Sequence, residues 1–201
     1  MYVLIIAGTP GTGKTSVAKL LASYLGCTHT NATIELQKVG GAVRDPTGRH
    51  TLLATKAGIE RAAASLRERA ARGCIILETV FPREWYEALE DVVLAIVLLR
   101  THPQELEGRL REKGWPEEKI IENVLAEAFN EVAEEILEIS HDVVEVDTTA
   151  KTPRESASKV LEKLLKWRTG ISIDWLSLSE VAELVTKLSL RLDTDKYRLG
   201  V

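Results

Sequence analysis

Residues 8–15 of this chain read Gly-Thr-Pro-Gly-Thr-Gly-Lys-Thr, and this segment limits the possible folds more than any other. It follows a continuous apolar run, Tyr2–Ala7, typical of a strand that is buried on both faces of a parallel sheet. It precedes residues 14–25, where apolar side chains recur at helical spacing until Gly26. In this context a G-x-x-x-x-G-K-[ST] segment binds phosphate, because its backbone N–H groups converge and the helix amino terminus adds positive potential.

The rest of the chain alternates short apolar runs with longer helical patterns. Strands are predicted at Cys74–Leu77, Ala95–Leu99 and Val143–Val146, and helices near 52–72, 103–112 and 153–167. Strands that alternate with helices indicate an α/β domain with a mainly parallel sheet. The 201 residues, of which 45% are hydrophobic, suffice for one sizeable domain and an appendage.

Three segments depart from this alternation. Residues 29–50 are rich in turn-forming residues and are predicted to be an irregular insert. A charged tip at 111–119 leads into one long helix, with apolar pairs from 120/121 to 136/137 and acids on its other face. After the break at Thr169 and Gly170, Ser177 and Glu180 resemble a capping box for an amphipathic helix, which is expected to dock on the core or on a second subunit. The oligomeric state stays open.

Composition and charge narrow the function classes. The net charge of -4 argues against a generally basic protein that coats nucleic acid. The longest apolar run, Val92–Leu99, is too short to cross a membrane, and the apolar amino terminus lacks the basic leader of a signal peptide. A cytoplasmic location is therefore predicted, with Cys27 and Cys74 as free thiols in a reducing compartment.

The glycine-rich segment indicates nucleotide binding but leaves the reaction open. Lys14 is expected to reach the β- and γ-phosphates, and the Thr15 hydroxyl is a candidate Mg²⁺ ligand. Glu78 is the only acid at the end of its strand. The cations Arg109, Arg111 and Lys113 either form a lid over the phosphates or belong to a solvated helix end.

At these residues the chain resembles the atypical adenylate kinase family of archaea and the eukaryotic nucleus, the adenylate kinase isoenzyme 6 type. The resemblance covers roughly residues 2–167 and is carried by residues 8–16, 95–101, 109–115 and 119–127. It implies a P-loop nucleoside monophosphate kinase fold that binds ATP with Mg²⁺ and phosphorylates AMP. The implied organisation is a core at 1–169, with a monophosphate-binding-like insert at 29–60 and a lid-like segment at 109–121, followed by a C-terminal helical extension at 170–201.

The resemblance also implies roles for individual residues. Catalysis is expected from Lys14, Arg109 and Lys113, and Lys113 stands where the family usually has arginine. Thr15 and Glu78 are the expected metal-binding residues. The segment 147–151 is expected near the adenine, so that the ATP-binding set is Gly11, Thr12, Gly13, Lys14, Thr15, Ser16, Lys113 and Lys151.

The chain departs from the family pattern at two places. The family usually has Asp-x-His where this chain has Leu77, Glu78 and Thr79, and strand alternation would turn Glu78 away from the missing Asp unless the strand has ended there. The acidic monophosphate-binding segment of the family is also poorly matched. The cations of this chain in that region are Arg44, Arg49, His50 and Lys56. They either hold a phosphate or are surface charges in solvent, and the sequence favours neither alternative.

Three functions follow from these observations. The first is an ATP-dependent kinase that acts on AMP or another nucleoside monophosphate. The second, which the resemblance also implies, is an ATP-driven factor in small ribosomal subunit maturation that contacts a ribosomal protein. The third is a nucleotide-binding module without turnover, which the intact Lys14 and Thr15 disfavour.

Overall fold

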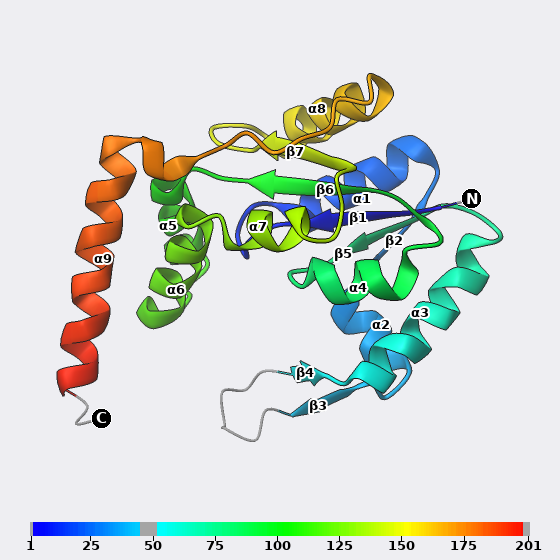
Figure 1. The fold of residues 1–201 in the computed structure, drawn as a ribbon, viewed down its shortest axis with the longest axis horizontal. Helices are drawn as coiled ribbons and strands as arrows, with labels where there is room; N and C mark the ends of the chain where they lie inside the picture. Colours follow the sequence, from blue (N-terminus) through cyan, green and yellow to red (C-terminus); the bar gives the residue numbers. More distant parts are fainter. Residues whose placement is uncertain (1, 45–51, 199–201) are drawn as a thin grey trace.

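The computed structural model describes residues 2–44 and 52–198, and its centre is a five-stranded parallel sheet (Figure 1). The strand order is β2-β5-β1-β6-β7. The strand β1 is therefore central, with β2 and β5 on one side of it and β6 and β7 on the other. In the register of the sheet, Ile5 lies beside Leu77 on one side and beside Ile96 on the other. The strands are β1 (Val3–Ala7), β2 (Thr28–Asn31), β5 (Ile75–Glu78), β6 (Val93–Arg100) and β7 (Val143–Asp147). This topology confirms the predicted α/β class.

Helices cover both faces of the sheet, and the alternation within β1 shows why. Val3 and Ile5 face α3 (Lys56–Ala70), α4 (Pro82–Leu89) and α7 (Glu131–Leu137), with Leu66 and Trp85 in the same cluster. The intervening residues of the strand pack with α1 (Lys14–Leu25) and α8 (Pro153–Leu165). Both faces of the strand are therefore buried, which explains its continuous apolar sequence.

The segment 29–50 was expected to be irregular, and in its described part this prediction is wrong. It contains the edge strand β2, the helix α2 (Ala32–Lys38) and the strand β3 (Ala42–Arg44), which pairs antiparallel with β4 (Leu52–Ala54). The Asn31 side chain caps α2 by accepting a hydrogen bond from the backbone N–H of Ile34 at 2.8 Å. The helix expected from residue 52 begins at Lys56, because Thr55 caps it through the N–H of Gly58.

The long helix predicted after residue 116 is two helices. The first, α6, spans Glu117–Ala128, and α7 begins at Glu131. Asn130 between them has a left-handed backbone, with φ of 59°, and its side-chain oxygen accepts a hydrogen bond from Arg100. A residue in this conformation ends a helix. The preceding helix α5 (Pro103–Glu112) lies where the sequence predicts it.

The C-terminal extension packs against α5 and α6, as Figure 1 shows, so the core is the one of its two expected docking places that the structure shows. Its long helix, α9 (Ser179–Arg198), places Leu188 in a cluster with Leu110 and Ile121, and Arg191 lies 3.3 Å from Glu117. The predicted cap at Ser177 is wrong. A short 3-10 helix, Trp175–Ser177, precedes α9 and is capped by Asp174.

Cys27 and Cys74 form a disulfide, so the prediction of free thiols is wrong. The two cysteines directly precede β2 and β5, and the parallel register pairs Thr28 with Ile75. This pairing brings the Cα atoms of the cysteines to 4.8 Å, within the range that a disulfide spans. The separation of 47 residues hid this proximity, because β2 was not predicted as a strand.

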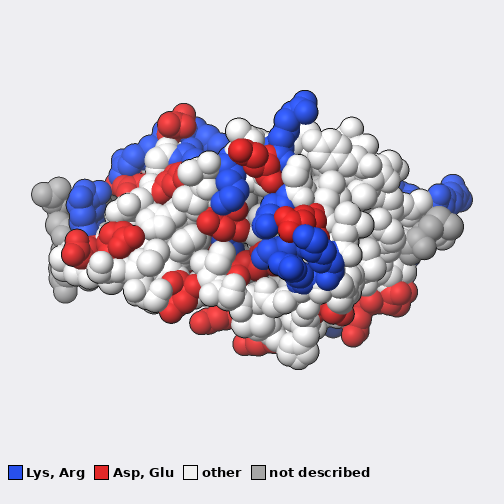
Figure 2. All heavy atoms as spheres, turned by 90° about the horizontal axis from the view of Figure 1, so that it is seen from above, with Lys and Arg blue, Asp and Glu red and all other residues white. Residues whose placement is uncertain are grey.

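The surface mixes charges of both signs. On the face seen in Figure 2, Lys and Arg side chains are interspersed with Asp and Glu. Several of these charges pair along helices, such as Glu162 with Lys159 and Lys166. Among the described residues, no helix combines the length and the apolar character needed to cross a bilayer.

Candidate functional site

The glycine-rich segment lies between the end of β1 and the start of α1, as predicted, and forms a tight loop. Gly8 has φ of 139°, and a Cβ atom at this position would lie 2.4 Å from the carbonyl oxygen of Leu99. Only glycine allows this approach to β6. The loop closes on itself where the Thr12 hydroxyl donates to the Thr9 carbonyl at 2.9 Å. Gly13 then caps α1, whose first residues are Lys14, Thr15 and Ser16.

Lys14 folds back over this loop. Its ammonium donates to the carbonyl oxygens of Gly8 at 2.7 Å and Thr9 at 3.1 Å. Burial lowers the pKa of Lys14 to about 8, although the negative charges of Glu78 and Glu127 oppose this shift. A buried cation at the start of a helix is suited to hold phosphate oxygens.

Glu78 is the last residue of β5, and its carboxylate reaches the loop. The Thr15 hydroxyl donates to Glu78 Oε1 at 3.1 Å, whereas Glu78 Oε2 lies 3.7 Å from Nε2 of His29 on β2. Within the described residues, Glu78 Oε2 and His29 Nε2 are buried without a hydrogen-bond partner. A buried carboxylate oxygen without a partner, next to a threonine hydroxyl, fits a Mg²⁺ site.

Arg109 joins the glycine-rich segment to the loop after β7. Its guanidinium donates to the carbonyl oxygen of Thr148 at 2.8 Å and, at 3.4 Å, to that of Gly11. Thr148 in turn donates to the carbonyl of Thr12 at 3.2 Å. A cavity of about 230 Å³ lies here and is bordered by Thr12, Gly13 and Lys151. The segment 147–151 therefore lies against the phosphate-binding loop, and its expected place near the adenine stays a prediction.

The other two cations of the predicted lid, Arg111 and Lys113, lie at the end of α5. Arg111 binds Glu107 and Glu117, and these hydrogen bonds raise its pKa above the ordinary arginine value. It is thus engaged in ion pairs on the surface, which corresponds to the solvated helix end, the second of the two alternatives that the sequence left open. Lys113 is exposed directly after α5, and its charge contributes to the lowered pKa of Lys14.

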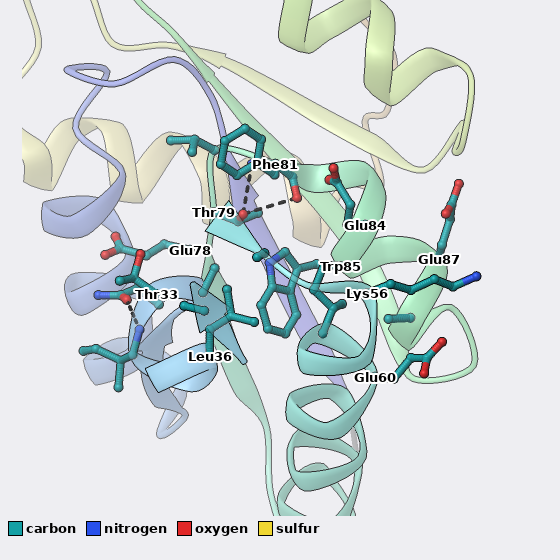
Figure 3. A pocket seen from close by; sticks show the side chains of 18 of the residues that line it. Thr33, Leu36, Lys56, Glu60, Glu78, Thr79, Phe81, Glu84, Trp85 and Glu87 are labelled. Carbon is teal, nitrogen blue, oxygen red and sulfur yellow. Dashed lines mark hydrogen bonds between the residues drawn. The ribbon is translucent and has the colours of Figure 1, made fainter. Parts of the chain in front are cut away.

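A larger cavity of about 1120 Å³ is lined by Lys14 and Thr15. Its walls come from α2, α3 and α4, and Figure 3 shows Trp85 between the end that carries Glu78 and the side that carries Lys56, Glu60 and Glu87. Leu36, Ile59 and Ala88 add further apolar surface. Because Lys14 and Glu78 border this cavity, a group bound in it would face the phosphate-binding loop.

The charges of this cavity differ from those of a dedicated phosphate site. Among its described lining residues, the cations are Lys14, Lys56 and Arg67, and Arg67 pairs with Asp91 at 2.9 Å. Its carboxylates are Glu60, Glu78, Glu84 and Glu87. Of the cations that the sequence suggested for a second phosphate, Lys56 lines the cavity, whereas Arg49 and His50 lie outside the described residues, as does the side chain of Arg44.

The sequence did not reveal Glu127, a buried acid that accepts a hydrogen bond from the glycine-rich segment. Glu127 was assigned to the acidic outer face of a helix, but it is 2% exposed and accepts a hydrogen bond from the Thr9 hydroxyl at 2.6 Å. His29 was also missed, because β2 was not predicted. The available signal for Glu127 was its place beside Ala128 at the end of an apolar stripe, where a solvent-facing acid is not expected.

Fold and site together place this chain among proteins with a P-loop fold. Residues 4–130 match the family described as AAA domain. The fold resembles that of shikimate kinase from Acinetobacter baumannii in complex with shikimate, with a TM-score of 0.58, 20% identity and coverage of 84% of this chain and 95% of the other. A gluconokinase from Sinorhizobium meliloti 1021 gives a TM-score of 0.51 at 18% identity, covering 82% and 92%.

Curated relatives make the family more specific. A protein of Pyrococcus abyssi is 35% identical over 86% of this chain and 91% of its own length, and one of Pyrococcus furiosus is 32% identical over 89% and 93%. Both bear the name "Putative adenylate kinase". The chain therefore belongs to this adenylate-kinase-like family, within the P-loop proteins whose fold it shares, and nucleotide kinase activity is the function that the family supports.

Proposed function

We propose that this protein transfers the γ-phosphate of ATP to AMP and releases two molecules of ADP. The observation that carries the proposal is that two cavities border consecutive residues of the phosphate-binding loop: Thr12 and Gly13 line the smaller one, and Lys14 and Thr15 line the larger one. The smaller cavity, next to Thr148 and Lys151, would take the adenosine of ATP. The larger one, between α2, α3 and α4, would take the monophosphate.

The reaction demands positioning and charge stabilisation more than covalent chemistry. The terminal phosphoryl group moves from the β-phosphate oxygen of ATP to a phosphate oxygen of AMP, and Lys14 would balance the charge on the oxygens of the transferred group. Arg109 and Lys113 would add positive charge from the lid, and backbone N–H groups of Gly11, Thr12, Gly13 and Ser16 would hold phosphate oxygens.

We assign the Mg²⁺ site to Thr15 and Glu78. Mg²⁺ prefers oxygen ligands, and the hydroxyl and the buried carboxylate provide two of them side by side. When bound, the ion neutralises charge on the phosphates. Glu78 is the terminal residue of β5, and its carboxylate reaches Thr15. It would therefore replace the acid that the family usually has at the position of Leu77.

Chromatographic measurement of nucleotide turnover tests this function. Purified protein with Mg²⁺ and ATP is incubated with AMP, CMP, GMP, UMP or no monophosphate. We expect ADP formation that depends on AMP and falls at least about 100-fold in Lys14→Ala, as when a preorganised charge-stabilising group is removed. Lys19→Ala, an exposed lysine of α1, serves as the control and retains activity. Equal phosphate release with and without AMP would contradict the proposal.

The acidic lining of the larger cavity favours a second candidate. Glu60, Glu84 and Glu87 would repel a monophosphate, so ATP hydrolysis without an acceptor is the alternative. In this case the protein would act as an ATPase switch in small ribosomal subunit maturation, in line with the resemblance to the isoenzyme 6 type, and would work in the cytoplasm. Its test is retention of small-subunit ribosomal proteins on the immobilised chain with ATP, ADP or no nucleotide; binding that ignores the nucleotide would contradict it.

A further inference from the structure

Glu127 on α6 connects the phosphate-binding loop with two other segments of the chain, the end of β6 and the C-terminal extension. Its Oε2 accepts from the Thr9 hydroxyl at 2.6 Å. Its Oε1 accepts from Arg100 Nε at 2.8 Å, from the backbone N–H of Thr101 at 3.1 Å and from the indole N–H of Trp175 at 3.0 Å. One buried carboxylate thus receives donors from the loop, from the end of β6 and from the C-terminal extension.

The loop residue in this network also contacts the candidate catalytic lysine. The carbonyl oxygen of Thr9 accepts hydrogen bonds from Thr12 Oγ1 at 2.9 Å and from Lys14 Nζ at 3.1 Å. A change in the position of Thr9 therefore changes the partners of Lys14. The path from Trp175 to Lys14 passes through two residues, Glu127 and Thr9, and each step is a hydrogen bond.

The extension is fixed to the same network at a second point. The backbone N–H groups of Ser172 and Ile173 donate to Glu145 Oε2 at 2.7 and 3.0 Å. Glu145 Oε1 accepts from Arg100 Nη1 at 3.1 Å, so Arg100 lies between the two carboxylates. Arg100, Glu127 and Glu145 are all at most 2% exposed.

Trp175 also packs against the residues that it bonds. Its side chain lies edge-on to His102 with ring centroids 5.3 Å apart, and the guanidinium carbon of Arg100 lies 5.8 Å from its ring centroid. It is 7% exposed and clusters with Ala128 and Val181. The indole therefore excludes water from the carboxylate as well as donating to it, and both effects fix the position of Glu127.

The charge balance explains why the extension matters. Two buried carboxylates face one guanidinium, so the acids need donors beyond Arg100. The extension supplies an indole N–H to one acid and two backbone N–H groups to the other. Without the indole donor, Oε1 of Glu127 would keep fewer partners, and the carboxylate would no longer be held in one orientation toward Thr9.

We propose that Trp175 is a positioning residue for nucleotide binding, through which residues 170–178 of the extension fix the phosphate-binding loop. Trp175 acts on the loop through Glu127 and Thr9, and Ser172 and Ile173 anchor the same segment through Glu145. It rests on the nucleotide-binding part of the proposed function and is independent of the acceptor.

Trp175→Phe tests the inference because it keeps an aromatic ring and removes the N–H donor. The dissociation constant of Mg-ADP, measured by calorimetry, is expected to rise about three- to tenfold, the size of coupling through a packed polar network. Trp167→Phe is the matched control: this tryptophan is 48% exposed beyond the end of α8, and the variant should bind Mg-ADP like the unaltered chain. Thermal unfolding of each variant identifies any loss of folded protein.

A double-mutant cycle separates positioning from general destabilisation. Thr9→Val removes the hydroxyl that donates to Glu127, so in this background Trp175→Phe should change the dissociation constant less than about 1.5-fold. A merely structural role of Trp175 would give independent, multiplicative effects. Coupling is also reciprocal, so Mg-ADP should slow hydrogen exchange at the amides of Ser172 and Ile173.

Three outcomes overturn the inference. One is an equal dissociation constant for Trp175→Phe and the unaltered chain, and another is independence of the two substitutions in the cycle. The third is no binding of Mg-ADP by the unaltered chain, which also removes the proposed function. Binding without AMP-dependent turnover removes only the acceptor assignment, because the cycle is read from binding alone.

Discussion

The two cavities beside the phosphate-binding loop differ in the groups that form them. On the side of Arg109 and Thr148, side chains and backbone carbonyls form a dense set of hydrogen bonds that holds the phosphate-binding loop. On the side of α2, α3 and α4, the cavity walls are mainly apolar, and charged groups such as Lys56 and Glu84 lie around them. The first region is preorganised to bind phosphate. In the second region, a few charged side chains decide which ligand can bind.

This difference separates phosphate binding, which depends on general backbone features, from recognition of an acceptor, which depends on particular side chains. Phosphate binding at a helix amino terminus uses the backbone and needs few particular side chains. Recognition of an acceptor needs side chains of matching charge, and here carboxylates outnumber the free cations among the described cavity residues. We therefore expect substitutions next to Lys14 and Thr15 to alter turnover and metal dependence, and substitutions in the wall formed by α2, α3 and α4 to alter stability.

The largest expected effect on stability comes from the disulfide that ties β2 to β5. A cross-link that closes a loop of this length, with a sequence separation of 47 between the two cysteines, is worth about 4 kcal/mol in the chain-entropy account and about 2–4 kcal/mol in practice. The double variant Cys27→Ser with Cys74→Ser should lose this free energy of unfolding in denaturant titrations. Reductant should weaken the unaltered chain and leave the double variant unchanged; equal midpoints for all four samples would contradict the estimate.

Next is Glu35, which joins the two helices of the cavity wall. Arg69 on α3 donates to both carboxylate oxygens at 2.9 Å, and Lys38 donates at 2.8 Å. Burial opposes ionisation of Glu35, but the hydrogen bonds from Lys38, Thr30 and Arg69 outweigh it and lower the pKa below 4.5. Glu35→Gln should therefore lower the free energy of unfolding by about 1.5–3 kcal/mol near neutral pH.

The sign of this pKa shift also fixes a pH dependence. A depressed carboxyl pKa contributes stability that is complete above about 4.5, the pKa of the unfolded chain, and is lost as pH falls through the lower native value. The difference between the unaltered chain and Glu35→Gln should shrink over that range in urea titrations. Glu68→Gln, an exposed acid on α3, is the control. A difference that stays constant from pH 7 to pH 3 would rule out this origin.

Where the larger cavity meets Lys14 and Thr15, Glu78→Gln should alter metal dependence rather than stability. The amide keeps the size of the side chain and an acceptor for the Thr15 hydroxyl, but it loses the negative charge. We expect about 10- to 100-fold lower turnover at limiting Mg²⁺, partly restored by excess Mg²⁺, as for other changes near a metal. Glu84→Gln, across the cavity, should leave the Mg²⁺ requirement unchanged, and an unchanged requirement in Glu78→Gln would contradict the assignment of the ion.

The sequence predicted the donor side better than the acceptor side, for physical reasons. The segment 8–15 is local, so its glycines, Lys14 and Thr15 are fixed by neighbours in the chain. The strand β2 is short, polar and at the edge of the sheet, with Thr28 exposed and Thr30 buried, and it lacks the apolar run that marks β1 and β6. Because this strand was missed, so were the disulfide and the approach of His29 to Glu78, both of which depend on β2 lying beside β5.

The burial of Glu127 was hidden for a different reason. A helix pattern distinguishes apolar from polar faces, and an acid is assigned to the solvent unless a buried cation is known. That cation, Arg100, ends an apolar strand 27 residues earlier, and the tertiary fold alone brings the two together. Trp175 donates to the same carboxylate, so the hydrophobic periodicity of the sequence could not reveal the role of the extension.

The smallest expected effect concerns Asn31, which lies at the border of the two sides, next to Thr15 and the cavity. Its side chain caps α2, and removal of such a cap costs about 1 kcal/mol, whereas glycine at the same position costs only a few tenths. Asn31→Ala should therefore lower the free energy of unfolding by about 1 kcal/mol, and Asn31→Gly by less. If Asn31 only caps the helix, the Michaelis constant for AMP should follow this order. If both variants raise it equally, Asn31 contacts the acceptor directly, and the acceptor side then contains a specific polar contact after all.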